Sequence, residues 1–349
     1  FRCNYLWINC IYLIFLWGKY MSFSCDVNNV YCTAVGTAVG RKEKEGPLGR
    51  YFDIFYSNDK CGEKNYESGE IKLLSDAYAS CLKRAKIKRE AIDLFIAGDL
   101  NNQIACSSKM ASSLDNSFIG VYGACATSML GNAIGSLLLS ANYVDNVMVG
   151  STSSFATAER QFRYPQEYGL PKRESVTTTV TGSAVLLLSH KISKVKISKI
   201  TLGEVCSPSS YDTTDMGTPM ALAAYDTILK HLKNNNETFA DYDLILTGDL
   251  SIVGSCMLKK LFLETGLKLN NHADCGELIY NIKKQKVFSG GSGAACCPLV
   301  TYTYIFDKII RGVFKRVLVV ATGALHAPIY VYQKKTIPTI AHAIVFERN

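Results

Sequence analysis

The sequence predicts an α/β fold made of two similar halves, each with a buried helix at its centre. The first observation is a repeat: Asp93–Leu100 is an apolar strand ending in a Gly-Asp turn, and Tyr242–Leu250 restates it about 150 residues later. The second is that Tyr122–Thr127 has a counterpart in Ser292–Cys297, each leading into a long apolar stretch. Two copies of one pattern predict two copies of one structural unit.

The third observation is a strand that follows the apolar stretch in each copy. Asn146–Ser153 falls opposite Arg316–Gly323, so each copy has the order strand, helix, strand. Alternation of this kind builds parallel-rich α/β sheets. We expect an N-terminal half over residues 21–190 and a C-terminal half over residues 191–349.

Residues 1–20 do not match this pattern. Tyr5–Trp17 is apolar but too short for a comfortable transmembrane helix. The segment has the length of a signal peptide and lacks a small-residue cleavage site. We interpret residues 1–20 as translated sequence upstream of a start at Met21, with a weak hydrophobic anchor as the alternative.

The elements of the first half follow from local patterns. Val30–Val39 predicts a strand, and the charged Gly40–Gly49, which contains Gly-Pro, predicts an exposed loop. Apolar residues at helical spacing over Ser68–Lys86 predict an amphipathic helix. Phe118–Val121 predicts a short strand, and Met129–Val144, apolar nearly all round, predicts a buried helix.

Composition excludes several classes of function. The 349 residues are 48% hydrophobic and 19% charged, which is typical of a globular protein. The net charge of +8 is spread along the chain, so we expect no nucleic-acid binding, whereas an anionic small ligand or an acidic membrane surface is compatible. Thirteen cysteines without metal-ligand spacing predict a reducing compartment and no disulfide framework or metal centre.

Cys125 is the central candidate for chemistry. It lies where a strand turns into the buried helix, and Gly123 lets the backbone bend ahead of it. A helix N-terminus favours negative charge, so the thiol is suited to act as a nucleophile or as an anion contact. The alternative is a small buried hydrophobe, which describes most free cysteines.

Seven motifs identify a family. They are Lys42–Gly49, Gly98–Gln103, Ala158–Pro165, Thr179–Gly182, Asp274–Gly276, Ala321–Leu325 and Ile337–Ala343. With them the chain resembles the stage V sporulation protein AD family, which has a thiolase-like fold. The resemblance implies noncatalytic binding of dipicolinic acid (pyridine-2,6-dicarboxylate), either free or as its calcium chelate.

The same resemblance implies a cellular setting. The family works with the SpoVA membrane proteins, which move dipicolinic acid into the developing spore and release it at germination. We therefore expect a peripheral protein on the reducing side of the spore inner membrane. A homodimer is expected because thiolase-like folds usually pair through a central strand edge.

An acyl-CoA condensing enzyme of the thiolase or ketoacyl synthase type, with Cys125 as nucleophile, is the alternative function. Such an enzyme needs His or Asn donors for the thioester oxyanion. The corresponding places hold Thr247–Asp249 and Ser289–Gly293, which contain neither, and an Asp there would repel a thiolate. We therefore expect no catalysis, and we interpret His272, outside these turns, as structural. A purely structural member of the membrane complex is the third possibility.

A dicarboxylate ligand calls for cations with planar donors. Arg160 and Arg163 are three residues apart and share a face if the stretch is helical, so at least one is expected to bind the ligand. The alternative is that they pair with Glu159 or Glu167. This chain departs from the family at Phe155, where the family usually has His, and the change could reshape the pocket.

The remaining candidates are polar residues near the strand ends. Asp99, Asn102 and Asp249 lie at strand carboxyl ends, where open α/β sheets place ligands. Asn102 can donate to a carboxylate, while the two aspartates are expected as turn residues unless a divalent cation, naturally calcium, bridges them to the ligand. The hydroxyls of Ser153 and Ser154 would complete a polar wall. We expect no resident metal and no other cofactor.

Overall fold

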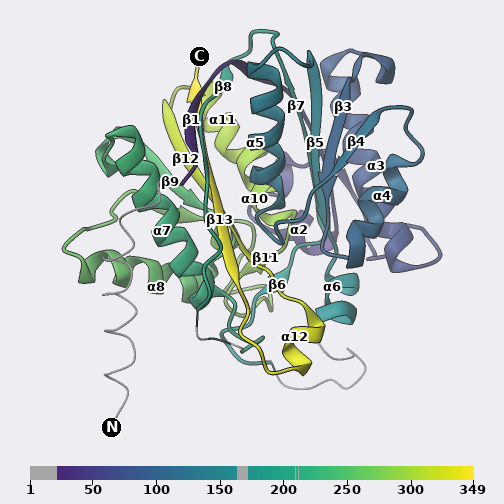
Figure 1. Ribbon diagram of the computed structural model, residues 1–349. Coiled ribbons are helices and arrows are strands. Elements are labelled where there is room, and N and C mark those ends of the chain that lie inside the picture. The colour runs from purple at the N-terminus through teal and green to yellow at the C-terminus, as the bar shows by residue number, and fades with distance from the viewer. Residues whose placement is uncertain (1–21, 163–171, 209, 211) are drawn as a thin grey trace.

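The computed structural model describes residues 22–162, 172–208, 210 and 212–349 (Figure 1). Within them, a mixed sheet of 11 strands has the order β10-β9-β12-β13-β8-β1-β7-β5-β3-β4, and β2 pairs with β1. The strands are β1 (Ser24–Val39), β2 (Ile54–Phe55), β3 (Leu94–Gly98), β4 (Ser117–Gly120), β5 (Asn146–Ser153), β7 (Gly182–Ser189), β8 (Val195–Leu202), β9 (Leu244–Thr247), β10 (His272–Asp274), β12 (Arg316–Ala324) and β13 (Thr339–Arg348). A separate pair is formed by β6 (Thr178–Thr179) and β11 (Gly291–Ser292).

The helices connect these strands. They are α2 (Arg41–Glu45), α3 (Tyr66–Ala85), α4 (Ala105–Ala111), α5 (Thr127–Ser140), α6 (Phe155–Phe162), α7 (Gly217–Asn235), α8 (Ser251–Glu264), α9 (Cys275–Leu278), α10 (Cys296–Val300), α11 (Phe306–Ile310) and α12 (Pro328–Tyr332). Short turns of helix are η1 (Gly49–Tyr51), η2 (Arg89–Ala91), η3 (Asn102–Ile104), η5 (Phe239–Asp241) and the π-helical η6 (Thr301–Ile305).

The two ends of the sheet repeat one arrangement. In the first half β4, β3 and β5 are parallel, and β7 runs antiparallel to both β5 and β1. In the second half β10, β9 and β12 are parallel, and β13 runs antiparallel to both β12 and β8. The halves meet where β1 and β8 pair in antiparallel fashion. The predicted α/β fold with two pseudo-symmetric halves is therefore confirmed.

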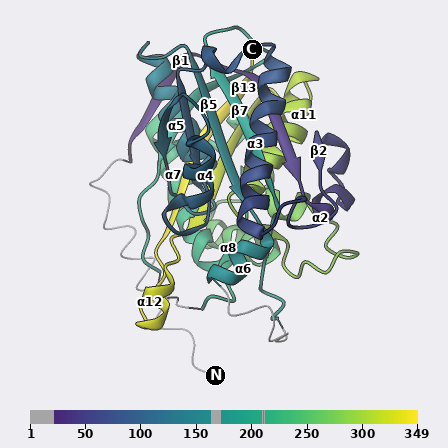
Figure 2. The same ribbon diagram turned by 90° about the vertical axis from the view of Figure 1, so that its right-hand side faces the viewer.

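Amphipathic helices cover the outer faces of the sheet. In Figure 2, α3 runs alongside β7 of the first half. Helices α7 and α8 pack against each other, and α7 contacts β12 and β13 of the second half. Helix α3 begins at Tyr66, two residues before the predicted start, because the side chain of Asn65 caps it by accepting a hydrogen bond from the Ser68 amide. Its buried positions, which include Leu73, Leu74 and Cys81, face β1 and β7, as the helical spacing predicts. No helix of the described residues is long and apolar enough to cross a bilayer.

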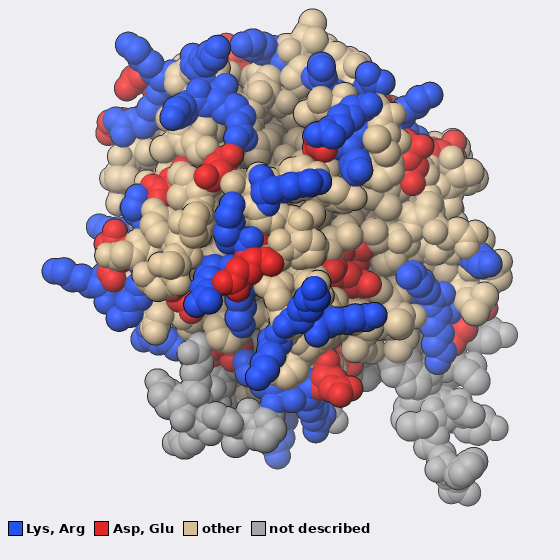
Figure 3. Space-filling view, turned by 180° about the vertical axis from the view of Figure 1, so that it is seen from behind, with Lys and Arg blue, Asp and Glu red and all other residues tan. Residues whose placement is uncertain are grey.

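The expectation of an exposed loop over Gly40–Gly49 was wrong. The segment forms helix α2 and leads into η1, on the face seen in Figure 3, where Lys and Arg side chains are widespread. Glu43 is only 1% exposed, and its carboxylate accepts from the Thr181 amide at 3.0 Å and from the Tyr280 hydroxyl. Burial raises the pKa of Glu43 to about 7. The burial of Glu43 cannot be recognised in the sequence, because the other charged residues of Gly40–Gly49 are at least partly exposed.

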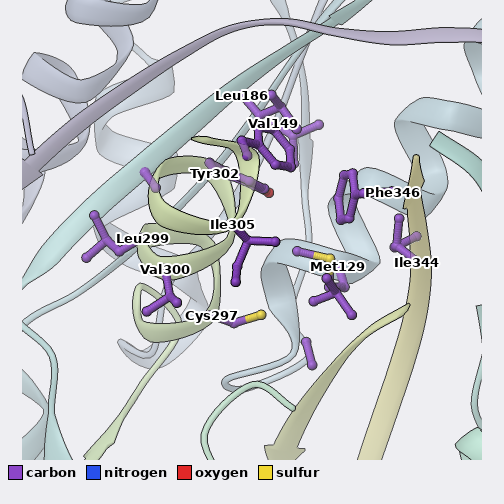
Figure 4. Close-up of a cluster of buried hydrophobic side chains, with 14 of the residues drawn as sticks. Met129, Val149, Leu186, Cys297, Leu299, Val300, Tyr302, Ile305, Ile344 and Phe346 are labelled. Atoms are coloured by element: carbon purple, nitrogen blue, oxygen red, sulfur yellow. The ribbon is translucent and has the colours of Figure 1, made fainter. Parts of the chain in front are cut away.

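The central helices lie between the two halves. Helix α5 contacts strands of both, and α10, η6 and α11 form a second helical column beside it. Figure 4 shows Met129 of α5 with residues of that column, among side chains of β5, β7 and β13. Met129, Val149, Leu186 and Phe346 are at most 1% exposed. The helix predicted over Met129–Val144 is therefore present and buried, and it ends at Ser140.

Candidate ligand pocket

A pocket lies where the strand ends of the two halves meet. It holds about 600 Å³ of empty space continuous with solvent. Its lining comes from both halves: Leu100, Tyr122, Ala124, Cys125, Ala158, Phe162, Thr177, Thr179, Thr213, Met216, Met220, Asp249, Ser292, Gly293, Ala324 and His326. The carboxyl ends of parallel strands are where α/β folds place ligands, so the pocket is the candidate site.

A tight turn before α5 places Cys125 in this pocket. Ala124 adopts the left-handed conformation (φ 50°), and Thr127 Oγ1 accepts from the Gly123 amide at 3.1 Å while donating to the Ala124 carbonyl at 2.6 Å. The turn packs against β12 so closely that a Cβ on Gly323 would lie 2.3 Å from the Gly123 carbonyl oxygen. The half-buried thiol is thus held at the boundary of the two halves.

Asp249 faces Cys125 from the second half. Its carboxylate accepts from Thr322 Oγ1 at 2.7 Å, from the Gly293 amide at 3.2 Å and from the thiol of Cys125. The side chain is 1% exposed, and burial raises its pKa to about 6, although these three donors oppose the rise. Asp249 is the single Asp, Glu, Lys or Arg among the described lining residues.

The pocket wall has a polar side and an apolar side. The parallel pair β6–β11 sets Thr179 opposite Ser292, and Thr177, just before β6, donates its hydroxyl to Ser292 Oγ at 2.8 Å. Leu100, Met216 and Met220 supply apolar surface from other elements. A flat ring with polar substituents would meet both kinds of surface here.

His326 is a pocket residue that the sequence analysis missed. It follows β12, is 9% exposed and lies against the ring of Phe162 with centroids 5.1 Å apart. It comes two residues after the end of β12, and Asp249 likewise comes two residues after the end of the neighbouring parallel strand β9. This position after a predicted strand could have identified His326 as a pocket residue from the sequence. Tyr122 is also in the lining, and burial raises its pKa to about 12.

A second hollow adjoins the first and shares Tyr122 and His326 with it. Asn102 lies in its wall, where Asn102 and Gln161 exchange two hydrogen bonds of 3.0 and 3.2 Å. The structure therefore brings Cys125 and Asp249 together and places Asn102 in the adjoining hollow.

Other predicted residues lie outside the lining. Ser153 is buried behind the wall, donating to the Val180 carbonyl at 2.8 Å and accepting from the Ala295 amide at 3.2 Å. Ser154 is also buried, and its hydroxyl has no hydrogen-bond partner among the described residues. His272 lies on β10, where its ring nitrogen and Thr247 Oγ1 are 2.9 Å apart.

Asp99 belongs to a buried cluster beneath the turn that follows β3. One oxygen accepts from the Asn101 amide at 2.9 Å and the other from the Ser107 amide at 2.7 Å, so Asp99 shapes the turn. Its oxygens lie near Glu70 and Cys106, the one group of described residues close enough to hold a metal ion. The side-chain amide of Asn101 already donates to all three residues, at 3.1 to 3.3 Å.

The predicted arginines do not meet at the pocket in the described residues. Arg160 is 56% exposed and pairs with Glu67 at 2.9 Å, and Arg163 lies outside the described residues. Phe155 is half-buried between two cations, with Lys42 and Lys172 each 5.0 Å from its ring centroid. The described lining thus supplies no cation for a carboxylate ligand.

Comparison with known proteins places this geometry in a family. The model of the family described as Stage V sporulation protein AD matches residues 22–347. Stage V sporulation protein AD of Bacillus subtilis (strain 168) is 46% identical over 320 residues, which cover 91% of this chain and 94% of that protein.

Solved structures show the fold. Cerulenin-bound OleA of Xanthomonas campestris matches with a TM-score of 0.60 and 14% identity, covering 92% of this chain and 97% of that one. The 3-oxoacyl-(acyl carrier protein) synthase III FabH of Xanthomonas oryzae matches with a TM-score of 0.57 and 13% identity, covering 92% and 99%. These likenesses confirm the thiolase-like fold.

Proposed function

The chain belongs to the stage V sporulation protein AD family, and from that membership we propose that it binds dipicolinic acid without transforming it. The observation that carries the proposal is the contact between Cys125 and Asp249. An acyl-transfer site needs a donor where the oxyanion forms. Here an acceptor occupies the space next to the sulfur, which suits retention of a ligand better than acyl chemistry.

The wall of the pocket supports this choice of ligand. Apolar side chains such as Met216 and Met220 fit the faces of a pyridine ring, and the hydroxyls of Thr179 and Ser292 can donate to carboxylate oxygens. A dianion beside Asp249 needs its charge reduced, because the described lining holds no Lys or Arg. The dianion is therefore expected to bind with a proton on Asp249 or as its calcium chelate.

Titration calorimetry of the full chain tests the proposal. Dipicolinate is titrated with and without calcium, and benzene-1,3-dicarboxylate, which has the same shape without the ring nitrogen, is the control ligand. We expect saturable binding of one dipicolinate per chain, and stronger binding with calcium if the chelate is the bound species. Absence of saturable heat under both conditions would contradict the proposal.

An acyl-CoA condensing reaction remains the second candidate, and His326 is the observation that favours it. A histidine in the same pocket as Cys125 could serve as a base or donor although it follows β12. Intact-mass measurement after incubation with acyl-CoA separates the two candidates. A stable acyl adduct that Cys125→Ala abolishes supports the enzyme, and an unmodified mass alongside dipicolinate binding supports the first function.

For its assembly we propose a homodimer that works next to SpoVA membrane proteins at the spore inner membrane. Strand β4 is the last strand at its end of the sheet, so its outer edge is available for pairing with a second copy. Sedimentation equilibrium tests the dimer. A monomer at every concentration would contradict the dimer. If calorimetry showed no dipicolinate binding, a purely structural role in the membrane complex would be indicated instead.

A further inference from the structure

A broad cluster of cations covers the face formed by α2, η1, the segment 281–288 and α11, which we call the basic face. Figure 3 views the molecule from this side, and Lys and Arg side chains outnumber Asp and Glu there. The cations that define the basic face are Lys42, Lys44, Arg50, Lys283, Lys284, Lys286 and Lys308.

Contacts between the segments hold these cations on one surface. Gln285 Nε2 donates to the Lys42 carbonyl at 2.7 Å, which fixes the segment 281–288 against α2. The rings of Tyr51 and Tyr304 meet with centroids 5.8 Å apart and join η1 to η6. Lys308 Nζ lies 5.4 Å from the centroid of Tyr304. The basic face is therefore continuous, although its residues are far apart in sequence.

The positive charge of the basic face is not neutralised locally. None of its defining cations forms an ion pair with a described residue. The partly exposed acids of α2 and α11, Glu45 and Asp307, are each paired within their own helix, with Arg41 at 2.7 Å and Arg311 at 2.8 Å. The remaining acid of α2, Glu43, is buried. A surface with this excess of cations is complementary to a broad anionic surface.

We propose that the basic face docks onto a bilayer surface containing anionic lipid. Exposed apolar and aromatic groups among the cations favour a bilayer over an acidic protein segment. Phe55 is 55% exposed beside Lys44, whose Nζ is 5.3 Å from the ring centroid. Aromatic rings settle at the headgroup level, and lysines extend long apolar stems to reach lipid phosphates. All but one of the cations are lysines, whose point charges suit a mobile array of headgroups.

Flotation of the full chain with vesicles tests the proposal. Vesicles of phosphatidylglycerol with phosphatidylcholine are compared with vesicles of phosphatidylcholine alone. The test variant neutralises three exposed lysines of the basic face: Lys283→Gln, Lys284→Gln and Lys286→Gln. We expect wild-type binding to anionic vesicles that weakens at high salt, and a loss of about a hundredfold in partition coefficient in the variant.

A control variant changes net charge equally at another place. It carries Lys259→Gln, Lys260→Gln and Lys268→Gln, which are exposed residues on α8 and just after it. Residues 1–21 are the same in both variants, so any binding they contribute cancels in the comparison. Equal loss in both variants, or no preference for anionic vesicles, overturns the proposal. Binding of wild type to polyglutamate but not to anionic vesicles overturns it in favour of an acidic protein partner.

Discussion

The thiol of Cys125, from the first half, donates a hydrogen bond to the carboxylate of Asp249, from the second half. The two residues precede different helices, α5 and α8, and the contact forms only when the halves are assembled. Because an ionised carboxylate accepts hydrogen bonds and cannot donate them, Asp249 places an acceptor and not a donor next to the sulfur. The same carboxylate also sets the charge that an anionic ligand meets in the pocket.

Dipicolinate binding should depend on the protonation of Asp249. With the pKa of Asp249 at about 6, the affinity should be level below pH 6 and fall about tenfold for each pH unit above it, because an ionised carboxylate repels the dianion. Calorimetry between pH 5.5 and 8 in calcium-free buffer measures this. Asp249→Asn should bind without that slope, whereas Asp226→Asn, at a carboxyl on α7 outside the pocket lining, should keep it.

Replacing Arg160 should leave ligand binding intact. Arg160 pairs with Glu67 at the surface, so Arg160→Ala is expected to change dipicolinate affinity by less than about twofold and the free energy of unfolding by less than about 1 kcal/mol. Thr179→Val, which removes a hydroxyl from the pocket wall, is the comparison and should weaken binding. A tenfold loss of affinity in Arg160→Ala would place that arginine at the ligand after all.

Glu70 should make the protein less stable as pH rises toward 8. Burial, and next the charge of Asp99, raise the pKa of Glu70 to about 8, so the folded state binds a proton that the unfolded state has released. The free energy of unfolding therefore falls between pH 4.5 and pH 8 on account of this group.

Urea unfolding is measured between pH 6.5 and 8 for wild type and Glu70→Gln, so that the groups common to both proteins, such as Glu43 with its pKa of about 7 and the buried histidines, cancel in the difference. Glu70→Gln should reduce the fall in this window by about 1–2 kcal/mol. An unchanged slope in Glu70→Gln would show that the acid is not protonated in the fold.

Truncating Met129 should destabilise the joint between the halves. Its side chain is fully buried on α5, so Met129→Ala is expected to cost about 2–5 kcal/mol of unfolding free energy. Leu263→Ala, at a position 68% exposed on α8, is the matched control and should cost far less. Equal effects of the two changes in denaturant unfolding would argue against the central packing.

The sequence was most informative for buried strands. The prediction Asn146–Ser153 coincides with β5, and Arg316–Gly323 differs from β12 by one residue, because both strands are buried and each contains an apolar run, at residues 147–149 and 317–321. Periodicity could not reveal α2, which is a five-residue helix with one buried face.

The pocket was predicted only in part, for a physical reason. Cys125 and Asp249 follow strands that the sequence identifies, so their convergence could be expected. The pocket residues Thr179 and Ser292 come from β6 and β11, strands of two residues each, which are too short to show a period of two. Helical spacing favoured a ligand-binding role for Arg160. Its observed partner, Glu67, lies on α3, and no local sequence pattern predicts that ion pair.

The pairing of β1 with β8 limits how a ligand can arrive. One hydrogen-bonded sheet runs through both halves, so a clamshell opening about their junction would break strand pairing and separate the central helices. Access must instead be at the rim, where the pocket is continuous with solvent and α6, α12 and the chain around Thr213 border the two adjoining hollows. Because the paired sheet holds the two halves together, a bound ligand would enter and leave at the periphery of the protein.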